Sequence, residues 1–281
     1  MDGEQQSAMC ARAEKSTAVV ASIGDVVLYE ADVATLEPCG WLGDLVIAFF
    51  FELFAARLAG GEGAELAGAI AAPATTGVVL LEPTVSYMAA VLGSSEALRE
   101  ALSVPHTPAA RPLTDVLADA SMVLLPVCDK SDPDSAVGGS HWSLLAFRRV
   151  RGNSRGEDAG VAFEHYDSAG SANAHHAQAV ASVLAPLVLG KELTSPSCLE
   201  IKLHEMHGPQ QVNGHDCGVY TVATAEILCG LSVHDMLPTL GTLAPALSAL
   251  TPEFIERKRL ELLHTVRAMA RSMQQQQQQQ R

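Results

Sequence analysis

The chain contains 281 residues, of which 48% are hydrophobic, and its formal net charge at pH 7 is −14. This length is enough to bury the core of one large domain or of two small ones. The acidic charge argues against a nucleic-acid-binding protein, because phosphate contacts need clustered lysine and arginine. Such a charge favours solubility, and it also permits a partner with a basic surface.

The sequence shows no pattern of a membrane span or of a secretion signal. The most apolar run, Leu45–Phe51, ends at Glu52 and is shorter than the roughly 18 residues that a membrane span requires. The amino-terminal stretch has no apolar segment ahead of a cleavage site. Six cysteines, at positions 10, 39, 128, 198, 217 and 229, form no CxxC pair. These features favour reduced thiols in the cytosol or nucleus.

The first half of the chain is predicted to be mainly helical. Residues 1–24 are polar and mixed, which indicates a flexible lead before a domain that spans 25–270. Asp44 is placed to cap a helix that runs into the mid-50s. The Gly/Ala-rich stretch of about 60–120 is interpreted as an insertion, which ends in short helices and a loop at His106–Pro112.

Four stretches of the second half have the patterns of β-strands. The first is a continuous apolar run, typical of a strand that is buried on both faces. The second and third are expected to pair across the charged turn Arg151–Gly160, and a helix over Ala174–Leu189 separates the third from the alternating fourth. The four stretches are Ser121–Cys128, Ser140–Val150, Val161–Asp167 and Leu199–Met206.

Helices return at the carboxyl end of the sequence. One is predicted from Cys217 to about Leu228, and another from Pro252 towards Gln280, fraying into a polyglutamine tail over 271–281. Helices before and after a small sheet are typical of the α+β class.

Cys217 stands where a loop with glycine and asparagine becomes an apolar-patterned helix. The positive end of a helix dipole favours thiolate over thiol, and the thiolate is the attacking species of a cysteine nucleophile. Gly218 is expected to leave space beside the sulfur. An inert buried thiol is the alternative for any single intracellular cysteine, so the residues around Cys217 decide the interpretation.

His141 and Asp167 are the candidates for a base and its orienting carboxylate. His141 opens one strand and Asp167 closes the next, 26 residues later (167 − 141). Antiparallel strands joined by a hairpin bring these two ends together, so an imidazole held by a carboxylate can face the thiolate. Gln211, six residues before Cys217, is a candidate donor to an oxyanion; a solvated loop glutamine is the alternative.

The order His-Trp, Tyr-Asp-Ser and Gln-x-x-x-x-Asp-Cys-Gly resembles the Ulp/sentrin-specific family of papain-like cysteine proteases. The match covers Val26–Phe54 and Val123–Cys229, and it is nearest to the deneddylating branch, which acts on the Nedd-type (Rub) modifier. The resemblance implies a papain-like fold with a small central mixed sheet flanked by helices. It also implies cleavage after the C-terminal Gly-Gly of a ubiquitin-like modifier, for precursor processing, for deconjugation from lysines, or for both.

The same resemblance gives roles to individual residues. The implied catalytic residues are His141, Asp167, Cys217 and, in the oxyanion hole, Gln211. Trp41 and Trp142, the only tryptophans, are implied to flank a tunnel for the modifier's Gly-Gly tail, with core packing as the alternative. Asp44 is implied to contact the modifier's C-terminal segment, with helix capping as the alternative. Gly43 stands where the family usually has asparagine.

The sequence also bears on other functions. Histidines cluster in the second half of the chain, but no HExxH or CxxC motif accompanies them, so we expect no metal and no other cofactor. The alternatives are a SUMO-specific or multi-modifier protease and a catalytically inactive modifier-binding module. The expected partners are the modifier and its conjugates, without nucleic acid or membrane. We expect a monomer in the cytoplasm, the nucleus or both.

Overall fold

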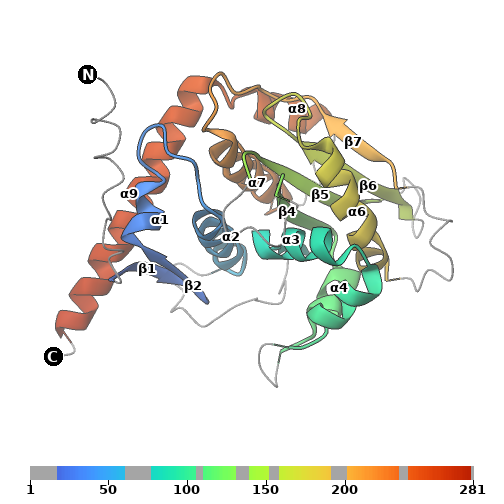
Figure 1. The fold of residues 1–281 in the computed structure, drawn as a ribbon, viewed down its shortest axis with the longest axis horizontal. Coiled ribbons are helices and arrows are strands. Elements are labelled where there is room, and N and C mark those ends of the chain that lie inside the picture. The colour runs from blue at the N-terminus through green and yellow to red at the C-terminus, as the bar shows by residue number, and fades with distance from the viewer. Residues whose placement is uncertain are drawn as a thin grey trace, which may run out of the picture.

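A mixed sheet forms the centre of the computed structural model, which describes residues 18–60, 77–105, 110–130, 139–151, 158–190, 201–233 and 240–279 (Figure 1). The strands of this described sheet lie in the order β3 (Val78–Leu80), β4 (Met122–Cys128), β5 (Trp142–Arg151), β6 (Asp158–Tyr166) and β7 (Leu203–Met206). The β4–β5 and β5–β6 pairs are antiparallel, whereas the outer pairs β3–β4 and β6–β7 are parallel.

The side chains of β4 and β5 alternate between two hydrophobic cores. On β4, Met122 and Leu124 belong to one core, and Val123 and Leu125 belong to the other. A strand that contributes to two cores has no solvent-facing side, which explains why β4 is apolar along nearly its whole length. The sequence prediction of a strand buried on both faces is confirmed.

The first core joins the sheet to helices from both ends of the chain. The helix α2 contributes a run of buried apolar side chains to it, Phe49 and Phe50 among them. In Figure 1, α9 runs beside the small antiparallel hairpin of β1 and β2, which closes this side of the molecule. The elements of this side are β1 (Val19–Ile23), β2 (Val26–Tyr29), α1 (Glu30–Ala34), α2 (Asp44–Leu58), α7 (Cys217–Val233), α8 (Leu240–Ser248) and α9 (Pro252–Gln279).

The second core lies between the sheet and four further helices. The largest of them, α6 (Ala174–Leu189), has the predicted bounds and packs against α3, α4 and α5. A left-handed Gly190 follows its last residue, because glycine adopts a positive φ at a helix C-terminus without steric cost. The other three helices are α3 (Pro83–Leu92), α4 (Ser95–Leu102) and α5 (Leu113–Asp119).

Several sequence expectations differ from the structure in detail. Gly43 is the N-cap of α2 and Asp44 is its first residue, so the predicted capping role of Asp44 is wrong by one position. The last residues of the expected lead form β1. Within the expected insertion of 60–120, the described residues form β3 and three helices, whereas 61–76 and 106–109 lie outside the described residues. None of the described helices is long and apolar enough to cross a membrane.

The burial of α2 gives a stability prediction. Phe49 is fully buried, so Phe49→Ala removes a ring from the first core, and we expect a loss of roughly 3–5 kcal/mol in the free energy of unfolding. Leu45 on the same helix is 39% exposed, and Leu45→Ala is expected to cost less than about 1 kcal/mol. Urea denaturation of both variants measures the difference, and equal losses would contradict the packing described for α2.

Candidate active site

Cys217 is the first residue of α7, as predicted, and it is almost completely buried. The side-chain oxygen of Asn213 accepts hydrogen bonds from the backbone N–H groups of His215 and Asp216, both at 3.1 Å. The Asn213 amide also donates to the Asp216 carboxylate at 2.8 Å. These bonds fix the turn that delivers the sulfur to the positive end of the helix.

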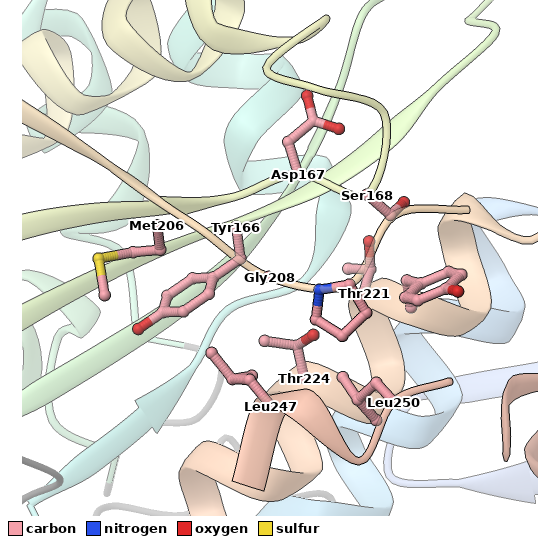
Figure 2. Close-up of a pocket in the computed structure, with 11 residues that line it drawn as sticks. Tyr166, Asp167, Ser168, Met206, Gly208, Thr221, Thr224, Leu247 and Leu250 are labelled. Carbon is pink, nitrogen blue, oxygen red and sulfur yellow. The ribbon is translucent and has the colours of Figure 1, made fainter. Parts of the chain in front are cut away.

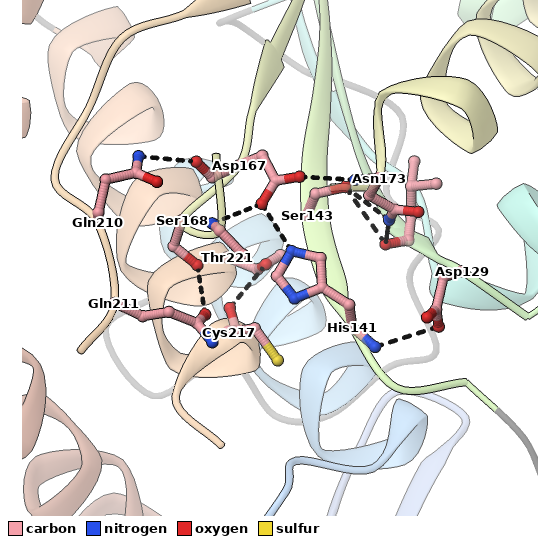
Figure 3. A network of polar contacts seen from close by, with 12 residues as sticks. Asp129, His141, Ser143, Asp167, Ser168, Asn173, Gln210, Gln211, Cys217 and Thr221 are labelled. Atoms are coloured by element: carbon pink, nitrogen blue, oxygen red, sulfur yellow. Dashed lines mark hydrogen bonds and ion pairs between the residues drawn. The ribbon is translucent and has the colours of Figure 1, made fainter. Parts of the chain in front are cut away.

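The structure brings His141 and Asp167 together at the ends of β5 and β6. His141 Nε2 lies 2.6 Å from Asp167 Oδ1, because the antiparallel register sets Leu144 opposite Tyr166. Figure 3 shows the Cys217 sulfur beside the imidazole ring. The structure therefore brings the three predicted triad residues together, with His141 and Asp167 placed as the hairpin argument expected.

The protonation states of His141 and Asp167 follow from their surroundings. Burial alone would lower the pKa of His141, but hydrogen bonds and charge interactions with Asp167 and Cys217 outweigh burial and raise the pKa to about 9. Burial likewise acts to raise the pKa of Asp167, yet hydrogen bonds from His141 and the backbone of Asn173 and Ala169 hold it below its usual range. At neutral pH the imidazole is therefore positively charged and the carboxylate is negative.

Two side chains that sequence reasoning missed hold the triad in place. Asp129, just after β4, accepts hydrogen bonds from the backbone N–H groups of Ser140 and His141, at 2.6 and 3.1 Å. Asn173 is fully buried, and its side-chain amide donates to the Val127 carbonyl and to the Ser143 hydroxyl, both at 2.9 Å. No sequence motif marks Asp129 or Asn173, because the groups that they bind lie in segments distant along the chain.

Gln211 lies in the loop before Cys217, and its side chain hydrogen-bonds to Asn213 and Ser168. Its Nε2 donates to the Asn213 carbonyl at 2.7 Å, and its Oε1 accepts from the Ser168 hydroxyl at 2.8 Å. An amide nitrogen carries two hydrogens, so the bond to Asn213 leaves one for another acceptor. The loop position fits the predicted role in an oxyanion hole, which stays a prediction.

A pocket of about 430 Å³ opens onto Cys217 and His141. Both tryptophans line it, and so does the exposed Asp44. The Trp142 indole N–H donates to the Leu42 carbonyl at 3.0 Å, which ties the segment that carries Trp41 to the start of β5. Trp41 is 51% exposed, so core packing does not explain it.

A second thiol, Cys128, lines the same pocket but is chemically different. Burial raises the pKa of Cys128 to about 11, and the nearby Asp129 and Cys217 act in the same direction. A thiol of this kind stays protonated at neutral pH and is a poor nucleophile. The pocket therefore holds two sulfurs, of which only Cys217 is beside the imidazole.

A smaller cavity, of about 20 Å³, lies behind Asp167 (Figure 2). It is enclosed by residues of β6, α7 and α8 and by the loop after β7, with the hydroxyls of Thr221 and Thr224 among its polar groups. Its size is about that of one water molecule. It is too small for a substrate.

Comparison with known proteins identifies the family. A model of the C-terminal catalytic domain of the Ulp1 protease family matches residues 41–239. The chain belongs to the Ulp1 protease family. Membership makes it a cysteine protease, as the resemblance implied. The matched range contains the contacting Cys217, His141 and Asp167.

Relatives of this Ulp1-family chain match over most of its length. The probable sentrin-specific protease 8 of Dictyostelium discoideum is 27% identical over 269 residues, which cover 89% of this chain and 98% of that protein. Human sentrin-specific protease 8 is 28% identical over 90% of this chain and 98% of its own. NEDD8-specific protease 1 of Arabidopsis thaliana is 27% identical over 75% of each chain.

Solved structures share the fold of this Ulp1-family chain. A de-sumoylating protease has a TM-score of 0.61 at 13% identity, with 94% of this chain and 96% of that chain covered. The C-terminal Ulp1 protease domain in complex with Smt3, the yeast ortholog of SUMO, has a TM-score of 0.55 at 16% identity, with 94% and 92% covered. The predicted α+β fold, a small mixed sheet flanked by helices, is confirmed.

Within the described residues, no group of three or more histidine, cysteine, aspartate or glutamate side chains is placed to hold a metal ion. The cysteines of this part, Cys39, Cys128, Cys217 and Cys229, carry free thiols.

Gly218 makes room for Leu42. The predicted space beside the Cys217 sulfur stays a prediction. A Cβ atom at Gly218 would lie 2.8 Å from the Leu42 Cβ. This close approach sets the segment with Trp41 directly against the start of α7. The glycine thus links the aromatic wall of the pocket to the helix that bears Cys217.

The close packing of Leu42 on Gly218 gives a prediction for Gly218→Ala. The added methyl group must displace Leu42, and because small displacements at an active site are costly, we expect kcat/KM to fall about tenfold or more. Gly230→Ala on the same helix is the control, because nothing lies within 4 Å of its added Cβ. We expect it to keep full activity and to gain up to about 1 kcal/mol in stability. Equal activity of both variants on a fluorogenic substrate would disprove the close approach.

The raised pKa of His141 predicts the pH dependence. The leaving nitrogen needs a proton from the imidazolium, so kcat/KM should stay level through neutral pH and fall as pH rises through about 9. Asp167→Asn removes interactions that raise this pKa, so the alkaline limb should move to lower pH and the rate should drop by roughly 10²-fold.

The control for the pH profile is another histidine–carboxylate pair. His165 Nδ1 lies 2.9 Å from Glu205 Oε2, on the β6–β7 pair. Glu205→Gln should leave the alkaline limb where it is. If the limb does not move in Asp167→Asn, His141 is not the group that titrates.

Proposed function

We propose that this protease cleaves the bond after the C-terminal Gly-Gly of a ubiquitin-like modifier and that it prefers the Nedd-type modifier. The observation that carries this is the contact of Cys217, His141 and Asp167 at a pocket with two indoles in its wall. The bond is a peptide bond in a precursor or an isopeptide bond to a lysine.

The proposed mechanism is acyl transfer from the modifier to Cys217 and then to water. The thiolate attacks the carbonyl carbon of the terminal glycine, and the imidazolium of His141 gives its proton to the leaving nitrogen as the C–N bond breaks. Water then attacks the thioester and loses a proton to His141. The modifier leaves with a free carboxylate, and the thiolate–imidazolium pair is restored.

The oxyanion of each tetrahedral intermediate needs donors close to Cys217. The backbone N–H of Cys217 at the start of α7 is one candidate. The second is the Gln211 amide, which the bonds to Asn213 and Ser168 hold in the loop before the nucleophile. Fixed donors of this kind need no reorganisation when negative charge develops on the oxygen.

The pocket fits a tail of small residues. Trp142 is anchored by its bond to the Leu42 carbonyl, and Trp41 is exposed on the neighbouring segment. Flat aromatic surfaces leave room for an extended glycine backbone but not for larger side chains. Asp44 lies exposed in the same wall, which suits a basic residue that precedes Gly-Gly.

The preference for the Nedd-type modifier draws support from the relatives. A relative from Arabidopsis thaliana is named NEDD8-specific protease 1, and the chain also resembles sentrin-specific protease 8 of several organisms. A SUMO-specific or multi-modifier activity is the second candidate, because the fold matches a domain solved in complex with a SUMO ortholog. A location in the cytoplasm or nucleus and a monomeric state stay predictions.

A cleavage panel tests the proposal. Fusions of the Nedd-type modifier, SUMO and ubiquitin, each with a C-terminal fluorophore, are compared at equal enzyme concentration, and we expect the highest kcat/KM for the Nedd-type fusion. A modifier with a C-terminal electrophile should form an adduct that is lost in Cys217→Ser. Faster cleavage of SUMO or ubiquitin would refute the preference, and binding without an adduct would refute the proposed nucleophile.

A further inference from the structure

Arg259 on α9 reaches two separate segments that lead into the active site. The residue is 3% exposed, and its guanidinium contacts one carboxylate and three backbone carbonyls. Its Nη2 and Nε lie 2.7 and 3.1 Å from Asp216 Oδ1. The carbonyls that accept from it are those of Thr35 at 3.0 Å, Glu37 at 3.4 Å and His215 at 3.1 Å.

The first of these segments leads to the aromatic wall. The Gly40 N–H donates to the Glu37 carbonyl at 3.0 Å, and a Cβ on Gly40 would clash with the Thr35 carbonyl oxygen, so the turn is tight. Trp41 follows at once, and the carbonyl of the next residue accepts from the Trp142 indole. Because Arg259 binds the carbonyls of Thr35 and Glu37, it fixes the position of the segment that leads into Trp41, the first residue of the aromatic wall.

The second segment leads to the nucleophile. His215 and Asp216 immediately precede Cys217, and Asp216 accepts from the Asn213 amide as well as from Arg259. Burial acts to raise the pKa of Asp216, but these hydrogen bonds and the charge of Arg259 keep it below its usual range. The carboxylate is thus charged and is held by two partners beside the first turn of α7.

We propose that Arg259 is a positioning residue that sets the spacing between the aromatic wall and the Cys217 sulfur. A guanidinium is planar and presents its N–H groups in a fixed fork, so the two segments cannot move apart without breaking bonds to one rigid group. Lysine keeps the charge but has a single ammonium on a flexible stem and cannot bridge both segments. The inference rests on the proposed role of Cys217 as nucleophile.

A neighbouring arginine provides a matched control. Arg267 lies on the same helix and pairs with the Glu37 side chain at 2.5 Å, but it is 54% exposed. Exposed ion pairs contribute little to stability. Arg267→Gln therefore removes an arginine contact to the same loop without touching the buried fork.

The experiment compares Arg259→Lys, Asp216→Asn and Arg267→Gln with the natural chain. The readouts are kcat and KM on the best fusion of the cleavage panel, the thermal midpoint, and the rate at which iodoacetamide alkylates Cys217, followed by mass spectrometry of its peptide. Alkylation needs no modifier, so it separates failure of this inference from failure of the proposed modifier preference.

For Arg259→Lys we expect kcat/KM to fall by roughly 10²-fold, with slower alkylation of Cys217, in protein that is folded at the assay temperature. Arg267→Gln should stay within about twofold of the natural chain in every readout. Folded Arg259→Lys with unchanged kcat/KM and unchanged alkylation overturns the proposal, because a purely structural arginine would lower only the thermal midpoint.

If Arg259→Lys fails to fold, Asp216→Asn tests whether Arg259 positions the segment that leads to Cys217. This variant keeps the carbonyl contacts of Arg259 to the wall segment and weakens the bonds that residue 216 makes with Arg259 and with Asn213 beside Cys217. We expect a lower kcat and slower alkylation, with KM within about twofold of the natural value. A natural rate of alkylation and a natural kcat in this variant contradict the proposal.

Discussion

The contact between His141 and Asp167 is the interaction on which the site depends. It exists because β5 and β6 are antiparallel neighbours whose register sets the start of one strand beside the end of the other. A slip by one residue would send every side chain of β6 to the opposite face, and the two cores forbid this, since Phe163 and Tyr166 of β6 already belong to different cores. The hydrophobic alternation of the sheet thus fixes the register that keeps His141 beside Asp167. The charge state of the imidazole depends in part on the same contact, because interactions with Asp167 and Cys217 together outweigh the effect of burial on the pKa of His141.

The groups around the triad share one physical feature: they are buried or half-buried polar side chains that bond to backbone. Asp129 binds the backbone N–H of His141, Asn173 binds the carbonyl of Val127, and Arg259 binds carbonyls on two segments. A buried polar group that lost its partners would cost free energy, so each of these groups resists displacement. The backbone near the active site is therefore held by fixed hydrogen bonds and not by apolar packing alone. Such rigidity suits a reaction in which one thiolate must meet one carbonyl carbon in an extended tail.

The pocket is assembled from segments that are distant in sequence. The Trp142 indole reaches the Leu42 carbonyl, Leu42 packs on Gly218, and Arg259 holds the turn that precedes Trp41. Trp41, His141 and Cys217 thus come from an amino-terminal loop, the start of β5 and α7.

The sequence by itself determined the chemistry and the central pairing. The position of Cys217 at a helix start, the two strands that carry His141 and Asp167, and the bounds of α6 all follow from local patterns, because strand alternation and helix periodicity repeat over a few residues. The family followed from motifs of the same short range. Only the tertiary structure decided the parts that depend on contacts between distant segments. Arg259 lies 222 residues from Glu37, whose carbonyl it binds, and Gly218 owes its presence to Leu42. No period or spacing encodes such contacts, because they arise only when the packed cores bring the two surfaces together. For this reason the sequence predicted which atoms react, and the fold decided which residues hold them in place.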